Sequence, residues 1–361
     1  MAHHPRRDPA AGSPGDLPGD LPAVSYVMPI LNEAAHVRAA VDSMMQQDYA
    51  GDFEVVLALG PSTDGTTEVV REMARADPRI TSVDNPTGST PGGLNAAIRA
   101  TRHPIVIRVD AHSLLPRDYT RIAVETLQAT GADNVGGLMS AEGRTPFEKA
   151  VARAYGARVG LGGTAHHVGG KEGPAETAYL GAFRRERLVE VGLFDEGVRR
   201  GQDWELNRRL RQSGGLVWFT PRMKVTYRPR STLRSLIRQF FATGLWRGEL
   251  ARRYTRQNSV RYFVPPVAVA GVAAGLLLGT AGLVGAALGM PGLRRLVGAF
   301  VVPGVYAGFV LVSTVSVASR DGAATMLRFA AVLPSIHFSW GTGFVLGFLE
   351  LTDDLDGHTG R

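Results

Sequence analysis

Three long runs without a charged side chain occupy the C-terminal part of the chain, at Tyr262–Leu293, Leu296–Ser319 and Phe329–Leu349. Each run is long enough for the roughly 20 apolar residues that cross a bilayer core as a helix. Buried helices of a large soluble domain are the alternative interpretation. We therefore expect a transmembrane region of about three helices over residues 262–350, followed by an acidic tail over residues 351–361.

Basic residues gather immediately ahead of the first run. Between Arg222 and Arg261 there are eleven Lys and Arg residues and one acid, Glu249, so this block alone exceeds the formal net charge of +7. Nucleic acid is a common partner of such a cluster, but a membrane segment beside it favours anionic headgroups and the positive-inside rule. We expect no nucleic acid partner. We expect a multi-pass protein of the inner (plasma) membrane, with this block and the preceding domain in the cytoplasm.

Apolar side chains recur at helical spacing inside the basic block. They predict basic amphipathic helices over residues 231–261 that lie in the membrane interface, with a core-facing helix as the competing interpretation. The apolar side chains are Leu233, Leu236, Ile237, Phe240, Phe241 and Leu245.

The amino-acid composition excludes several kinds of site and segment. The chain has no cysteine, which excludes disulfides, thiolate metal sites and cysteine nucleophiles and is consistent with a catalytic part in the cytoplasm. Residues 1–22 carry Pro, Gly, Asp and Arg without an apolar stretch, so we expect a disordered tail there, and neither a secretory signal nor an anchor.

Between residues 23 and 230, β-rich runs alternate with helical patterns. This alternation predicts an α/β domain with a mostly parallel sheet and flanking helices. Ligands of open α/β sheets bind beyond the carboxyl ends of the strands, and polar residues follow each run, so we expect one cleft at that edge. The runs are VSYVMPI, FEVVLAL, ITSVD and PIVIRVD, followed by helical patterns over 33–47, 65–76, 92–102 and 117–130.

The fourth run ends in RVDAHS, residues 108–113. Asp110 and His112 stand two residues apart at a strand end, so both side chains point to the same side and suit a divalent ion. A turn or helix N-cap role is the alternative for Asp110. Further along, the segment GLGGTAHHVGGKEG lacks periodicity, and we expect a mobile loop with solvated His166 and His167.

Six blocks in a fixed order give the chain its family resemblance. They resemble the family 2 glycosyltransferases with the GT-A fold, and among these the succinoglycan-type exopolysaccharide glycosyltransferases that carry C-terminal membrane helices. The resemblance covers about residues 23–260 and implies inverting transfer of a sugar from a nucleotide diphosphate donor. The blocks are VMPILNEAAHV, GPSTDGTTEVV, DNPTGSTPGGLNAAIRAT, IRVDAHS, ETAYLGAFRRE and GQDWELNRRLR.

The resemblance also implies a metal site and a catalytic base. The family places a divalent cation on a D-x-D motif, which Asp110 and His112 match with an imidazole in place of the second acid, so we expect Mn²⁺ or Mg²⁺ with some preference for Mn²⁺. The family's base follows an acid at a helix start, and Asp203 matches it with Gln202 in the place of that acid. A helix N-cap or first-turn acid is the alternative for Asp203.

Donor and acceptor residues follow from the same blocks. Many relatives have two acids where this chain has Leu59 and Gly60, and one of those acids contacts the base. Because this chain departs from that pattern, the base is left open and a UDP-sugar is only the default donor. Trp204, Tyr179 and Gly181 are expected on the acceptor side, with a core role as the alternative for Trp204. The expected donor residues are Pro29, Asn32, Glu33, Ser62, Asp64, Asn85, Asn95 and Asp110.

The processive members carry Q-x-x-R-W on an interfacial helix, and this chain lacks the strict motif at Gln239–Thr243. We therefore expect a single sugar addition to a polyprenyl-diphosphate-linked acceptor in exopolysaccharide or cell-surface glycan synthesis. A polyprenyl-phosphate sugar synthase and a non-catalytic nucleotide-sugar-binding scaffold are the alternatives.

Overall fold

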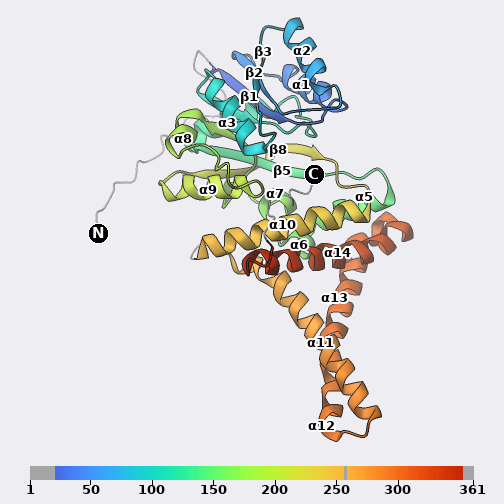
Figure 1. Cartoon of the computed structure of the whole chain (residues 1–361). Coiled ribbons are helices and arrows are strands. Elements are labelled where there is room, and N and C mark those ends of the chain that lie inside the picture. The colour runs from blue at the N-terminus through green and yellow to red at the C-terminus, as the bar shows by residue number, and fades with distance from the viewer. Residues whose placement is uncertain (1–20, 256–257, 353–361) are drawn as a thin grey trace.

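The computed structural model describes residues 21–255 and 258–352. The expected disordered tail, apart from its last two residues, and the acidic tail after Thr352 lie outside the described residues. The described chain forms an α/β domain on a platform of two long helices, from which a helical hairpin projects (Figure 1).

An eight-stranded mixed sheet forms the centre of the domain. Its order is β3-β2-β1-β4-β7-β5-β8-β6, with parallel pairing from β3 to β4 and again between β5 and β8, whereas β7 is antiparallel to both neighbours. The strands are β1 Val24–Ile30, β2 Phe53–Leu59, β3 Ile80–Asp84, β4 Ile105–Arg108, β5 Asn134–Ala141, β6 Gly173–Pro174, β7 Tyr179–Arg184 and β8 Val217–Tyr227.

Helices cover both faces of this sheet. Alternate side chains of β1 enter opposite cores: Tyr26 and Met28 pack with α1 and α4, whereas Val27 packs with α3 and α9. Because both faces are buried, β1 reads as a continuous apolar run. The helices of the domain are α1 Val37–Met45, α2 Thr66–Ala76, α3 Thr90–Ala100, α4 Tyr119–Thr130, α5 Pro146–Gly156, α6 Arg158–Leu161, α7 Ala165–Val168, α8 Arg185–Glu190 and α9 Gln202–Gln212.

Local sequence sets several helix starts around the sheet. The Ser89 hydroxyl accepts from the Gly92 backbone N–H at the start of α3, and Pro91 stands in the first turn. Thr145 and Glu148 form a reciprocal capping box at the start of α5. These caps satisfy backbone N–H groups that have no partner within the helix.

Within the basic stretch 231–261, the described residues form one long helix, α10 (Leu233–Arg253), and a short turn at Val260–Tyr262. Leu236, Phe240 and Leu245 of its apolar stripe are buried, whereas Leu233 and Ile237 are exposed. The buried side of α10 faces α14 (Ala323–Phe348), and the two helices lie side by side beneath the α/β domain (Figure 1). The competing prediction of a core-facing helix therefore describes this side of α10.

Two GxxxG patterns allow α10 and α14 to approach closely. A Cβ atom at Gly244 or Gly248 would lie 2.0 or 2.2 Å from the carbonyl oxygens of Trp340 and Phe344. A Cβ atom at Gly343 or Gly347 of α14 would come similarly close to the backbone of α10. Small residues spaced by four are typical of helix pairs in membranes.

Two further long helices form the projecting hairpin. They are α11 (Val264–Ala287) and α13 (Val301–Ala318), joined by the short α12 (Pro291–Arg294) at the tip (Figure 1). The C-terminal end of the hairpin returns to the domain, where Arg153 of α5 pairs at 2.7 Å with Asp321 just after α13. The hairpin helices and α14 are long and apolar enough to cross a membrane.

We predict that Gly248→Leu disrupts the α10–α14 contact. The added side chain meets the backbone of α14, so the substitution should lower the free energy of unfolding by about 1–3 kcal/mol or more. Thermal unfolding of the detergent-solubilised protein measures this change. Gly308→Leu is the matched control, because a Cβ at Gly308 of α13 meets no atom within 4 Å. Equal melting temperatures for the two variants would contradict the prediction.

Candidate active site

The loops after β1 and β2 are joined at the carboxyl edge of the sheet. Asn32 adopts a left-handed conformation with φ 56°, its N–H donates to Ser62 Oγ at 3.0 Å, and its Oδ1 accepts from the Thr63 N–H at 2.8 Å. Asp64 accepts from the Ala34 N–H at 3.0 Å. The structure thus brings together Asn32, Ser62 and Asp64, which were expected at the donor. Pro29 is the residue before the last of β1.

Asn85 and Asn95 occupy structural positions. The Asn95 amide is buried and donates to the Phe194 carbonyl and to Glu196, while its Oδ1 accepts from the Phe194 N–H. The buried Asn85 amide donates to the Ser89 carbonyl before α3. Both side chains therefore bond to loop backbone in this structure, and their contact with the donor stays a prediction.

A buried arginine connects the two acids that the sequence singled out. Arg108, the last residue of β4, pairs with Asp110 at 3.0 Å and also with Asp203 in the first turn of α9. Burial alone lowers the pKa of the Arg108 guanidinium, but the two carboxylates raise it above the ordinary value. Sequence reasoning missed Arg108, although residues i and i+2 of an extended segment share one face and Arg108 therefore accompanies Asp110.

The environment of Asp203 differs from that of a capping residue. The N-cap of α9 is Gly201, and the cap makes no side-chain hydrogen bond, so the structure does not support the N-cap alternative. Asp203 is an acid of the first turn, as the other half of that alternative expects. Burial raises the pKa of the Asp203 carboxyl, Arg108 opposes the rise, and Asp110 adds to it. A carboxylate with a raised pKa beside a cavity is suited to accept a proton.

The structure places His112 with Glu33 rather than with Asp110. His112 Nε2 lies 3.0 Å from Glu33 Oε1, and the His112 ring lies 4.5 Å from the ring of His36. Glu33, His36 and His112 form a group whose potential ligand atoms lie within 4.8 Å of one another. The sequence analysis did not select His36, which follows Glu33 by three residues at the entry to α1.

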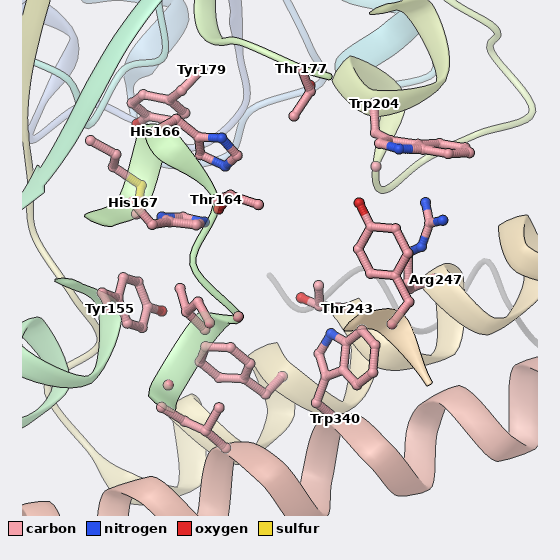
Figure 2. Close-up of a pocket in the computed structure, with 18 of the residues that line it drawn as sticks. Tyr155, Thr164, His166, His167, Thr177, Tyr179, Trp204, Thr243, Arg247 and Trp340 are labelled. Atoms are coloured by element: carbon pink, nitrogen blue, oxygen red, sulfur yellow. The ribbon is translucent and has the colours of Figure 1, made fainter. Parts of the chain in front are cut away.

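A cavity of about 470 Å³ lies between the α/β domain and the helices α10 and α14, and Asp203 forms part of its wall. Figure 2 shows aromatic, histidine and arginine side chains from both parts around this space. Lining residues include Tyr155, Thr164, His166, His167, Thr177, Tyr179, Trp204, Thr243, Arg247 and Trp340.

The segment expected as a mobile loop forms one side of the cavity. It contains the end of α6 and all of α7, and His166 and His167 are half-buried cavity residues rather than solvated side chains. Burial lowers the pKa of His166 to about 4, with Arg261 adding to the effect, so His166 is neutral at physiological pH. Sequence periodicity could not detect this, because packing against another part of the chain creates the burial.

Of the three residues predicted on the acceptor side, Trp204 and Tyr179 line the cavity and Gly181 is not among the lining residues. Gly181 lies inside β7, where a Cβ would be 2.2 Å from Asn134 Oδ1, so its role is packing within the sheet. The Trp204 indole N–H donates to Glu176 at 2.9 Å, and the Arg247 guanidinium lies 3.9 Å from the Trp204 ring centre. Burial lowers the pKa of Arg247 to about 10.

Comparison with known proteins identifies the family. Residues 25–192 match the family described as Glycosyl transferase family 2. Over 254 residues the chain is 35% identical to the succinoglycan biosynthesis protein ExoA of Rhizobium meliloti (strain 1021), covering 70% of this chain and 77% of that protein. The chain belongs to glycosyltransferase family 2. This glycosyltransferase functions in exopolysaccharide or glycan biosynthesis.

Two further proteins extend the comparison. A Methanococcus voltae dolichyl N-acetyl-alpha-D-glucosaminyl phosphate 3-beta-D-2,3-diacetamido-2,3-dideoxy-beta-D-glucuronosyltransferase is 23% identical over 240 residues, covering 64% of this glycosyltransferase and 74% of that protein. The mannosyltransferase PcManGT from Pyrobaculum calidifontis, solved with GDP-Man and Mn²⁺, matches at a TM-score of 0.57 and 19% identity over 94% and 92% of the two chains. The predicted family and GT-A fold are thereby confirmed.

We predict that Arg108 sets the pH below which the transfer rate of this glycosyltransferase falls. Because Arg108 lowers the pKa of Asp203, Arg108→Gln should move the acid limb of the pH–rate profile to higher pH by about 1–3 units. Arg108→Lys keeps a positive charge, so the acid limb of its pH–rate profile should stay close to that of the unmodified enzyme. Equal acid limbs in the Gln variant and the unmodified enzyme would show that Arg108 does not act through a titrating carboxylate.

Proposed function

We propose that this enzyme transfers one sugar, with inversion, from a nucleotide diphosphate sugar to a polyprenyl-diphosphate-linked acceptor in bacterial exopolysaccharide or cell-surface glycan synthesis. The cavity carries this proposal, because one wall holds Asp203 and another is formed by α10 and α14 beside the apolar hairpin. A lipid-linked acceptor has to present a sugar hydroxyl to the catalytic domain while its chain stays in the membrane. The position of the cavity meets both requirements.

The cavity contains polar groups that suit such an acceptor. Thr164 Oγ1 and His167 Nδ1 are buried there without a hydrogen-bond partner, which is costly unless a ligand supplies one. Arg247 and Arg261 line the same cavity and can pair with a diphosphate. The name of the Methanococcus relative describes action on a dolichyl-phosphate-linked sugar, which supports a lipid-linked acceptor for this chain as well.

Asp203 is the proposed base of the displacement. Its carboxylate accepts the proton of the attacking hydroxyl, and Arg108 favours the ionised form by opposing the rise in the Asp203 pKa that burial causes. The attacking oxygen then bonds to the anomeric carbon while the bond to the nucleotide diphosphate breaks on the opposite face. A single displacement of this kind inverts the configuration at that carbon.

The donor is proposed to bind at the rim formed by Asn32, Ser62 and Asp64, with a UDP-sugar as the default. Divalent Mn²⁺ or Mg²⁺ neutralises the charge that develops on a leaving diphosphate. Of the two residues expected to hold it, His112 stands beside another potential ligand, Glu33, whereas Asp110 pairs with Arg108. The potential metal ligands here, one carboxylate and two imidazoles, fit a divalent transition metal.

The membrane attachment is proposed to consist of the α11–α13 hairpin, with α10 and α14 at the membrane surface. The 24 residues of α11 reach about 36 Å at 1.5 Å per residue, enough to cross the hydrocarbon core. Exposed large hydrophobic side chains crowd the hairpin, whereas α14, which the structure describes in full, exposes only Leu327 among its large hydrophobic residues. In this proposal the chain crosses the membrane twice, through α11 and α13, instead of the three times expected from the sequence. Helix α14 then stays on the cytoplasmic side with the catalytic domain.

We predict that Asp203→Asn abolishes transfer while leaving donor binding nearly intact. Loss of a general base lowers kcat by about 10²–10⁴-fold. Purified protein in detergent is incubated with a panel of radiolabelled nucleotide sugars and polyprenyl lipids, and calorimetry measures donor affinity in parallel. A product formed from polyprenyl phosphate alone would favour the sugar-phosphate synthase alternative.

Glu68→Gln is the matched control, because Glu68 is an exposed acid in the first turn of α2 and has no place in the cleft. It removes the same helix-end charge as Asp203→Asn, so it should retain full transfer. Robust transfer by Asp203→Asn would rule out its role as base. Loss of donor affinity in that variant would place Asp203 on the donor side.

The topology is tested with single cysteines, since the chain contains none. Leu288→Cys at the hairpin tip and Leu351→Cys after α14 are both at exposed positions. In intact spheroplasts, a membrane-impermeant maleimide should label position 288 and should label position 351 only after permeabilisation. Glu72→Cys in the catalytic domain is the control for the cytoplasmic side. Labelling of position 351 without permeabilisation would show that α14 crosses the membrane.

A further inference from the structure

Glu33, His36 and His112 converge at the carboxyl edge of the sheet. One carboxylate oxygen and two imidazole nitrogens lie within 4.8 Å of one another, and the contact from His112 Nε2 to Glu33 Oε1 is 3.0 Å. Glu33 is partly buried, whereas both histidines are exposed, so the group is open to a ligand from the cleft. These residues come from segments that are about 80 positions apart in the chain.

The fold holds the three residues in place through two neighbouring strands. β1 and β4 pair in parallel, with Val27 opposite Arg108, so the segments that follow them emerge side by side. The Glu33 carbonyl accepts from the N–H groups of His36 and Val37 at 2.9 Å, forming a turn into α1. This turn sets the spacing between Glu33 and His36 before any ion binds.

The β2–α2 turn fixes the same loop from the other side. The Glu33 N–H donates to Thr66 Oγ1 at 2.8 Å, and the Ala34 N–H donates to Asp64 at 3.0 Å. A site whose ligands are held by such bonds loses little conformational freedom when it binds an ion. Asp110 is in a different situation, because its carboxylate is engaged by Arg108.

We propose that Glu33, His36 and His112 hold the divalent cation of this enzyme, with His36 as a ligand outside the D-x-D position. Two imidazoles and one carboxylate suit Mn²⁺ and other divalent transition metals better than Mg²⁺, which prefers oxygen ligands. The three protein ligands leave positions open for oxygens of a donor diphosphate. This inference deepens the metal requirement of the proposed function and concerns binding of the ion alone.

The test measures Mn²⁺ binding to the full-length protein in detergent, without nucleotide or acceptor, by electron paramagnetic resonance of free and bound Mn²⁺. Disturbing a residue that only orients a ligand weakens metal binding about 10–100-fold, so His36→Ala and Glu33→Gln should weaken it at least about tenfold. Asp110→Asn should bind Mn²⁺ as the unmodified protein does. Nitrogen couplings of the bound ion report histidine ligation directly and should decrease in His36→Ala.

His103→Ala is the matched control, because His103 precedes β4 at the opposite, amino end of the strand, 3.9 Å from Glu54. It should bind Mn²⁺ normally, and thermal unfolding verifies that every variant is folded. Unchanged binding and unchanged nitrogen couplings in His36→Ala would overturn the inference, as would a loss confined to Asp110→Asn. Because no sugar is transferred in this measurement, failure of the proposed transfer reaction would not alter its outcome.

Discussion

The buried guanidinium of Arg108 is the interaction on which the arrangement of the catalytic edge depends. A buried positive charge is stable only when it is paired, and here Asp110 of its own segment and Asp203 of α9 provide the partners. The two acids stand more than 90 positions apart, so this contact fixes α9 against the end of β4. It also opposes the rise in the Asp203 pKa that burial causes.

The second constraint is the close contact between α10 and α14. Four glycines allow the two backbones to meet, and the resulting platform forms the floor of the cavity. Together with the α/β domain, this platform encloses the cavity that Asp203 borders. The hairpin of α11 and α13 is attached to the same platform and is tied to the domain through Arg153 and Asp321.

The sequence predicted the repetitive parts of the fold well. The first three strand runs match β1, β2 and β3 residue for residue. β1 and β2 are buried on both faces and read as continuous apolar runs, whereas β3 is a mostly exposed edge strand. The site was predicted in part: Asn32, Ser62 and Asp64 do meet at one rim. Asn85 and Asn95 were placed by motif, as was Gly181, and the structure gives the two amides loop contacts and the glycine a tightly packed place in β7. Their donor and acceptor roles stay predictions.

The sequence by itself determined the family, the α/β pattern and the presence of long apolar helices, because each of these is written in local composition and in the order of motifs. Tertiary structure alone decided that Arg108 joins Asp110 to Asp203, that His36 lies beside His112, and that His166 and His167 line a cavity. It also decided that α14 lies along α10. These are contacts between distant segments, and their geometry depends on strand order and helix packing, which no local periodicity encodes.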